Sequence, residues 1–180
     1  FDPEALTILE GKKNRILLRQ KEAIDARWSY RSMLGGVLAQ ETDRAVETTA
    51  EMKCVTQVAP TEAELTDLVF ATKLVKHSKS NAIVLSKGGQ LIASGVGQTS
   101  RVDALKQAIE KARHFGFDLK GAVLSSDAFF PFDDCVTLAA EAGITAIAQP
   151  GGSVRDADSI AAADRLGVAM VMTGVRHFKH

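Results

Sequence analysis

The chain has little cysteine, no excess of either charge and no long hydrophobic run. Its 180 residues include two cysteines, and 22 basic residues balance 22 acidic ones. A net charge of zero gives no global electrostatic reason to bind nucleic acid or an anionic membrane, so we expect neither partner. No apolar run approaches the ~20 residues of a membrane span. Two distant cysteines, Cys54 and Cys135, and the lack of a signal-peptide pattern indicate reduced thiols, so we expect a cytoplasmic protein.

Zinc-ligand spacing is absent as well. Neither the four histidines nor the two cysteines follow a pattern such as H-E-x-x-H or paired C-x-x-C. The H-x-E and P-C-x-x-C signature of the zinc deaminases is also missing. We therefore expect no zinc cofactor and no metal-assisted deamination.

The most distinctive stretch is the run GAVLSSDAFFPFDD at residues 121–134. Its first part is short and apolar, which is typical of a buried strand. It continues into a turn that holds three of the eight phenylalanines, Phe129, Phe130 and Phe132. Aromatic rings at the end of a buried strand must be covered, either by the core or by a flat ligand. This run alone leaves both explanations open.

Periodicity and helix-cap signals predict an α/β fold. The first 60 residues give weak signals: a helix from Asp2-Pro3-Glu4, a strand at 15–18 and a polar connection over 41–52. The later elements that we expect are a helix capped by Thr61 and Glu64, a hairpin of strands 81–85 and 91–94, a helix after Ser100, strand 121–124, helix 134–142, strand 144–148, helix 156–166 and strand 168–172. This order favours α/β layers around a mixed sheet, with an opening hairpin followed by βα units.

The topology also predicts where a ligand would bind. Ligands of such sheets gather at the carboxyl ends of the parallel strands. The turn 125–134, the loop 149–153 and the tail 174–180 all leave strands at that end. We expect these three segments to meet.

Two polar features near the hairpin have alternative explanations. The stretch GVGQTS at 95–100 lacks the third glycine of a dinucleotide fingerprint and follows a hairpin, which argues against that function. Arg101, at the start of the next helix, either helps to bind an anion or is a solvated arginine beside a capped helix. Asn81 either closes a turn or uses its amide, which can accept and donate hydrogen bonds at once, to hold a polar group of a ligand. Neither arginine, Arg101 or Arg176, lies on a predicted core face.

Further motifs, taken in order, identify a family. They are VKHSKSNAIVL at 75–85, GVGQTSRVD at 95–103, SSDAFFPF at 125–132, QPGGSVR at 149–155 and TGVRHFKH at 173–180. Together they resemble the C-terminal part of the bifunctional purine-biosynthesis family AICAR transformylase/IMP cyclohydrolase. The resemblance implies a layered, cytidine-deaminase-like α/β domain. It implies that residues 1–60 connect to a preceding half of the transformylase domain and that 61–180 form its C-terminal α/β subdomain. Because the sequence also begins without methionine, we expect a piece of a longer protein.

The resemblance implies transfer of a formyl group from 10-formyltetrahydrofolate to AICAR, a step of IMP synthesis, in an enzyme whose separate IMP cyclohydrolase domain lies outside this chain. It implies that Asn81 is catalytic and contacts the substrate. The other implied contacts are Arg101, Phe129 and Arg176 for the AICAR nucleotide, and Val102, Asp134, Ser153 and Val154 for folate. It also implies a structural potassium ion near Ser80 and Asp127, and a homodimer with sites formed between the subunits.

The pair Lys76-His77 needs separate treatment. The family's proton shuttle is assigned to a Lys-His pair in the first half of the transformylase domain, which this chain lacks. Lys76 and His77 end a predicted helix, where cations offset the helix dipole, so we interpret them as structural. The alternative to an enzyme is a non-catalytic regulatory module that binds a nucleotide phosphate, and bound folate would distinguish the two.

Overall fold

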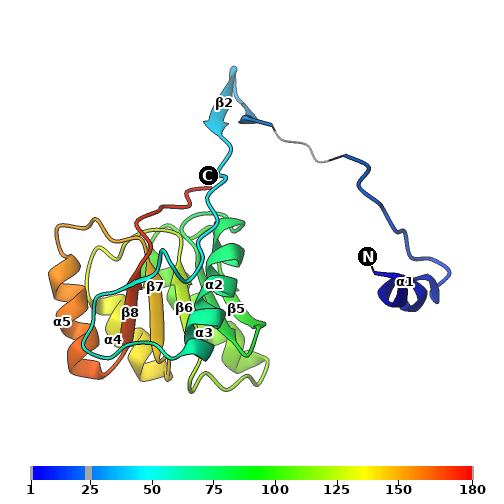
Figure 1. Cartoon of the computed structure of the whole chain (residues 1–180). Helices are drawn as coiled ribbons and strands as arrows, with labels where there is room; N and C mark the ends of the chain where they lie inside the picture. Colours follow the sequence, from blue (N-terminus) through cyan, green and yellow to red (C-terminus); the bar gives the residue numbers. More distant parts are fainter. Residues whose placement is uncertain (1, 23–25, 180) are drawn as a thin grey trace. The chain divides into compact units, whose positions relative to one another are not determined.

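The computed structural model describes residues 2–22 and 26–179 and divides into two compact units, Phe1–Asp43 and Arg44–His180. The first unit contains helix α1 (Pro3–Glu10) and a hairpin of β1 (Trp28–Met33) and β2 (Gly36–Glu41) (Figure 1). The predicted helix start is confirmed, because the Asp2 carboxylate accepts a hydrogen bond from the Ala5 N–H at 2.7 Å.

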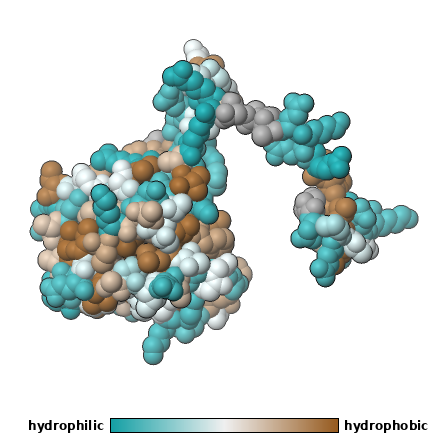
Figure 2. All heavy atoms as spheres, viewed as in Figure 1, coloured by the Kyte–Doolittle hydropathy of each residue, from teal (hydrophilic) through white to brown (hydrophobic). Residues whose placement is uncertain are grey.

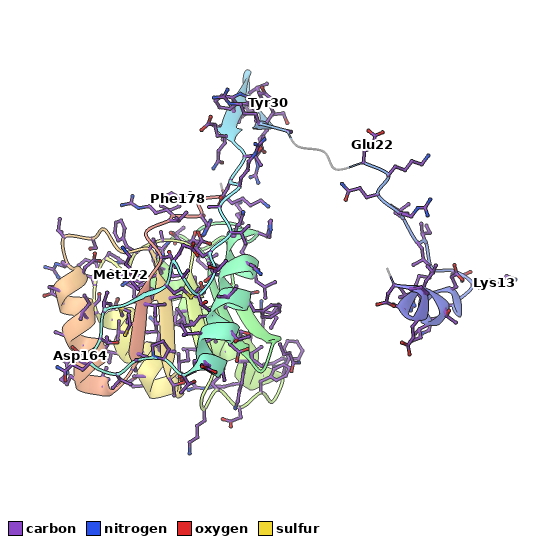
Figure 3. The ribbon with its side chains drawn as sticks, viewed as in Figure 1. Lys13, Glu22, Tyr30, Asp164, Met172 and Phe178 are labelled. Carbon is purple, nitrogen blue, oxygen red and sulfur yellow. The ribbon has the colours of Figure 1, made fainter. Side chains whose placement is uncertain are left out.

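The strand expected at 15–18 is wrong. These residues have no regular structure, and Ile16 and Leu18 are 84% and 82% exposed. Neither sheet of the described residues includes them, and an isolated apolar stretch gains nothing from an extended conformation without a ladder partner. The first unit instead forms its hairpin around Gly35, whose φ of +77° suits glycine in a tight turn. All residues of this hairpin are exposed, as Tyr30 illustrates in Figure 3.

The second unit is built on a six-stranded sheet with the order β3-β8-β7-β6-β4-β5. The strands are β3 (Lys53–Cys54), β4 (Ile83–Lys87), β5 (Gln90–Gly95), β6 (Val123–Ser126), β7 (Ala146–Gln149) and β8 (Ala169–Met172). The pairs β6–β7 and β7–β8 are parallel, and the other pairs are antiparallel. The prediction of an α/β fold with a mixed sheet, an opening hairpin and βα units is therefore confirmed. Strand β3 was missed because two residues are too few to show a periodic pattern.

Helices cover both faces of this sheet (Figure 1). Helix α2 (Glu62–Lys76) packs on one face, and α3 (Arg101–His114), α4 (Asp134–Ala142) and α5 (Asp156–Leu166) pack on the other. The strands alternate accordingly: Ile83 and Leu85 of β4 point to the three-helix side, and Val84 points to α2. On the face seen in Figure 2, small hydrophobic areas of this unit are separated by hydrophilic residues.

Local signals set the helix boundaries where the sequence placed them. The Thr61 hydroxyl accepts from the Glu64 N–H, and the Glu64 carboxylate accepts from the Thr61 N–H, so the predicted capping box is present. Ser100 caps α3 in the same way, through the N–H of Asp103. Gly143 ends α4 with a φ of +96°. No helix in the described ranges has both the length and the apolar character needed to cross a membrane.

Candidate functional site

Three segments meet at the carboxyl ends of the parallel strands, as the topology predicted. The His177 N–H donates to the Asp127 carbonyl at 2.9 Å, which joins the tail to the turn after β6. The Phe130 N–H donates to the buried Gln149 Oε1 at 2.9 Å, which joins that turn to the end of β7. The Gly174 N–H donates to the Pro150 carbonyl at 3.1 Å, so the tail and the loop after β7 are also joined. Figure 3 shows the tail running from Met172, at the end of β8, to Phe178.

The hairpin strands bring further groups to this edge. Strand β4 runs antiparallel to β6, so Asn81, just before β4, lies at the end where β6 finishes. Strand β5 is antiparallel to β4, so it ends at the same edge and leads through residues 96–100 into α3. Asn81 and Arg101 are therefore neighbours although 20 residues separate them.

Asp127 is the centre of this arrangement. Its Oδ1 accepts from Nη2 of Arg101 at 2.7 Å and from the Ala82 N–H at 3.2 Å. The Asp127 side chain is fully buried and that of Arg101 is 9% exposed, so this is a buried ion pair. Asp127 Oδ2 and Arg101 Nε are buried and have no hydrogen-bond partner in the described part of the chain. Asp127 thus joins the start of β4, the start of α3 and the tail.

The Asn81 side chain makes hydrogen bonds to other groups of the protein. Its Oδ1 accepts from Nη2 of Arg101 at 3.0 Å. Its Nδ2 donates to the carbonyls of Gln98 at 3.0 Å and Thr99 at 3.3 Å. Both donors of the amide are used in this way, and one lone pair of its oxygen remains. Asn81 therefore orients the Arg101 guanidinium and closes the loop between β5 and α3.

Arg176 and Phe129 form a cation–aromatic pair. The guanidinium carbon of Arg176 lies 4.8 Å from the centre of the Phe129 ring. A Cβ at Gly152 would lie 3.2 Å from Nη2 of Arg176, so glycine at this position allows the loop after β7 to approach the arginine closely. Phe129 is half-buried and Arg176 is exposed. This pair places the exposed positive charge of Arg176 over a partly accessible aromatic ring.

The four residues that the resemblance assigned to folate lie on the loops and helix starts of the same edge. Val102 is half-buried in the first turn of α3, and Asp134 is the exposed first residue of α4. Ser153 is half-buried and Val154 is fully exposed in the loop after β7. A second cation–aromatic pair joins this loop to the turn after β6, because the Arg155 guanidinium carbon lies 5.1 Å from the Phe132 ring centre.

Cys135 lies close to these groups but is held as a thiol. Burial raises the pKa of the Cys135 thiol to about 12, and the negative charge of Asp134 adds to the effect. The positive charge of Arg101 acts in the opposite direction without overcoming burial. Cys135 is therefore no nucleophile at neutral pH.

Ser80 and Lys76 make hydrogen bonds within the protein, and His77 ends helix α2. The Ser80 hydroxyl accepts from the Lys179 N–H at 3.0 Å, and the Ser80 N–H donates to the Lys179 carbonyl at 3.0 Å. Lys76 lies in the last turn of α2 and donates to the Ala45 carbonyl, and His77 is the exposed C-cap residue. The described residues contain no group of three or more His, Cys, Asp or Glu side chains arranged to hold a metal ion.

One buried pair was not anticipated. Nε2 of His177 lies 3.0 Å from Oε2 of Glu47, and both side chains are buried. Glu47 belongs to the polar stretch that the sequence indicated only as a connection. A single carboxylate in a charged segment carries no local signal of burial, so sequence reasoning had no means to find it.

The chain belongs to the family described as AICARFT/IMPCHase bienzyme, whose model matches residues 1–111. The resemblance drawn from the motifs is confirmed at this level. Curated relatives named "Bifunctional purine biosynthesis protein PurH" match the whole chain: the one from Bacteroides thetaiotaomicron is 62% identical over 180 residues, and that from Chloroflexus aurantiacus is 53% identical over 182. The chain spans 36% of the length of each.

Solved structures give weaker similarities. A deaminase/reductase from Thermotoga maritima, described as acting on diaminohydroxyphosphoribosylaminopyrimidine, is 24% identical with a TM-score of 0.43, and the match covers 60% of this chain and 34% of that one. The dCMP deaminase of cyanophage S-TIM5 is 19% identical with a TM-score of 0.44, and the match covers 62% of this chain and 98% of that one.

Proposed function

We propose that this chain is the C-terminal half of the transformylase domain and that it binds the two substrates of formyl transfer from 10-formyltetrahydrofolate to AICAR. The observation that supports this most directly is the pair formed by Arg176 and Phe129. An exposed guanidinium suits an anionic phosphate, and an adjacent ring suits a flat heterocycle. A ribonucleotide has both parts.

The two arginines contribute differently. The charge of Arg101 is largely offset by Asp127 at 2.7 Å, so its remaining N–H groups orient polar parts of a substrate rather than neutralise a phosphate. Arg176 retains an exposed charge and is the main anion contact. Asn81 holds Arg101 in place and keeps one lone pair of its oxygen for a substrate donor.

The reaction sets clear demands on such a site. The amine nitrogen of AICAR attacks the formyl carbon and loses a proton, and the bond from that carbon to the folate nitrogen breaks as that nitrogen gains a proton. The amine is a weak nucleophile because the neighbouring carboxamide withdraws electron density. Catalysis then depends on orienting both substrates, accepting the proton and stabilising the oxyanion. This chain would supply orientation, and the proton acceptor would lie in the preceding half of the domain.

The proposed folate contacts and the proposed cation lie at the same edge of the sheet. Val102, Asp134, Ser153 and Val154 would line the folate side, where the second cation–aromatic pair joins two of the loops. A potassium ion near Ser80 and Asp127 fits the chemistry present, because the buried Oδ2 of Asp127 has no hydrogen-bond partner in the described residues and such ions take oxygen ligands. When bound, the ion would supply positive charge that stabilises this carboxylate.

The remaining parts of the proposal concern the whole enzyme. We propose a cytoplasmic homodimer whose sites form between subunits, with a separate cyclohydrolase domain outside this chain. The domain built from both transformylase halves would have a cytidine-deaminase-like layering without zinc. The helix, sheet and helix layers of Arg44–His180 are compatible with that arrangement.

Ligand binding to the intact enzyme tests the proposal. Arg176→Ala should weaken AICAR binding, measured by isothermal titration calorimetry, by roughly 10- to 100-fold, because a charge-assisted hydrogen bond contributes about 1.5–3 kcal/mol. Arg113→Ala, an exposed arginine near the end of α3, is the matched control and should bind as the unaltered enzyme does. An affinity of Arg176→Ala within about twofold of the unaltered enzyme would remove Arg176 from the site.

A second measurement separates the enzyme from the regulatory module. A folate analogue should bind together with AICAR, and Val154→Asp should weaken the folate analogue without weakening the nucleotide. A regulatory phosphate site has no reason to bind a pterin. Nucleotide binding with no folate binding would therefore favour the regulatory module.

A further inference from the structure

We propose that Glu47, acting through His177, is a positioning residue that holds the C-terminal tail so that Arg176 lies over Phe129. The inference rests on the nucleotide-binding role proposed for Arg176. It adds a residue from the connecting stretch, far from every motif, to the residues on which that role depends.

The contact itself is buried and specific. The side chains of Glu47 and His177 are 3% and 1% exposed, and Oε2 of Glu47 lies 3.0 Å from Nε2 of His177. With a proton on Nε2, the ring donates to the carboxylate. Oε1 of Glu47 is also buried and has no hydrogen-bond partner in the described residues. A carboxylate is rarely buried unless it is paired, so the contact with His177 offsets the cost of burying Glu47.

Contacts of both the backbone and the ring hold His177, and the position of Arg176 depends on them. The His177 N–H donates to the carbonyl of Asp127 at 2.9 Å, and its ring contacts Glu47. Arg176 is the preceding residue, is exposed, and meets Phe129 only two residues after Asp127. The backbone bond fixes the distance between the tail and the turn. The ring contact fixes the rotation of the tail, and therefore the direction in which Arg176 points.

Loss of the Glu47 contact should lower the fraction of molecules whose tail is competent to bind. An apparent dissociation constant rises in inverse proportion to that fraction. Once the nucleotide is bound and the tail is ordered, the reacting groups are unchanged. Nucleotide affinity and KM should therefore respond to the loss, and kcat should not.

The test uses the intact enzyme with Glu47→Ala, Glu47→Gln and the control Glu51→Ala. Glu51 is an exposed carboxylate of the same segment that contacts Thr48. Glu47→Ala should raise both the dissociation constant and the KM of AICAR by about tenfold, leave kcat within about twofold, and speed hydrogen exchange of residues 174–179. Glu47→Gln keeps an acceptor for the ring N–H and should restore most of the affinity. Glu51→Ala should match the unaltered enzyme.

The double variant decides whether Glu47 acts through Arg176. In an Arg176→Ala background, Glu47→Ala should weaken nucleotide binding by no more than about twofold further, because coupled residues are not additive. If Glu47→Ala is too unstable to purify, Glu47→Met fills the same space without an acceptor and should give the same readouts.

Each failure has a distinct signature. If Arg176→Ala weakens binding but Glu47→Ala and Glu47→Met change neither tail exchange nor affinity, the positioning role is wrong and the proposed function stands. Full additivity of the two losses also overturns the positioning role. If Glu47→Ala loosens the tail but Arg176→Ala leaves affinity unchanged, the function proposed for Arg176 is wrong.

Discussion

Nη2 of Arg101 lies 2.7 Å from Oδ1 of Asp127, and this ion pair is buried behind the start of α3. The same nitrogen donates to Oδ1 of Asn81 at 3.0 Å. Arg176, by contrast, is exposed and stacks on Phe129. The two arginines are alike in the sequence, where neither falls on a core face. In the structure, Arg101 is part of a buried ion pair that supports the fold, whereas the guanidinium of Arg176 is accessible to a ligand.

Substitution of the two arginines should change the free energy of unfolding by different amounts. Arg101→Met leaves the buried Asp127 carboxylate without its cation and should lower the free energy of unfolding by about 3–5 kcal/mol. Arg176→Ala removes an exposed side chain and should change it by no more than about 0.5 kcal/mol. Urea unfolding followed by circular dichroism measures both. Equal losses would show that Asp127 does not depend on Arg101.

Asn81 should affect turnover more than affinity. In the intact enzyme, Asn81→Ala frees the Arg101 guanidinium and should lower kcat by about 10²-fold, with a smaller effect on nucleotide affinity. Asn81→Asp should be nearly as harmful, because a carboxylate would face the carbonyls of Gln98 and Thr99 and would repel a developing oxyanion. Steady-state kinetics with a normal kcat for Asn81→Asp would exclude Asn81 from the mechanism.

Gly95 should tolerate no side chain. A Cβ there would lie 1.8 Å from the carbonyl oxygen of Ala104, because the end of β5 packs directly against the backbone of α3. Gly95→Ala should therefore destabilise the protein by about 1–3 kcal/mol or more. Gly36→Ala is the control, since nothing lies within 4 Å of its Cβ position. Thermal unfolding at the same midpoint for Gly95→Ala and the unaltered protein would contradict this packing.

The two cysteines should differ in reactivity. Cys54 is exposed, whereas burial raises the pKa of Cys135 to about 12. At pH 8, iodoacetamide should therefore label Cys54 and leave Cys135 unmodified, as peptide mass spectrometry would show. Since the Cys135 pKa is raised in the folded state, its contribution to stability is present below the unfolded pKa and is lost as the pH rises through the folded value. Rapid labelling of Cys135 at pH 8 in the folded protein would contradict its burial.

The capping box of α2 should make the free energy of unfolding depend on pH. Burial raises the pKa of Glu64, but hydrogen bonds from Thr145 and Thr61 outweigh it, so the pKa is lowered overall. The carboxylate then contributes stability above its unfolded pKa, and this contribution is lost as the pH falls through the folded pKa. Urea unfolding should show Glu64→Gln less stable than the unaltered protein at pH 7, with the difference shrinking toward pH 3. Glu62→Gln, which removes an exposed carboxylate from the same turn, is the matched control for the loss of a charge there.

Local sequence patterns were enough to predict the helices and strands of the second unit, except the two-residue strand β3, and the edge of the sheet at which its loops meet. Caps such as Thr61 with Glu64 act within one helical turn, and the strand order of a βα sheet brings loop ends together by topology. The pairing of the buried polar groups, in contrast, depends on how the layers pack. Arg101 pairs with Asp127, which is 26 residues later in the sequence, and Glu47 pairs with His177, which is 130 residues later. No local pattern signals such partners, because each is defined by burial, which arises only when the layers pack. The strand expected at 15–18 was wrong for the same reason: a strand exists only when another strand lies beside it.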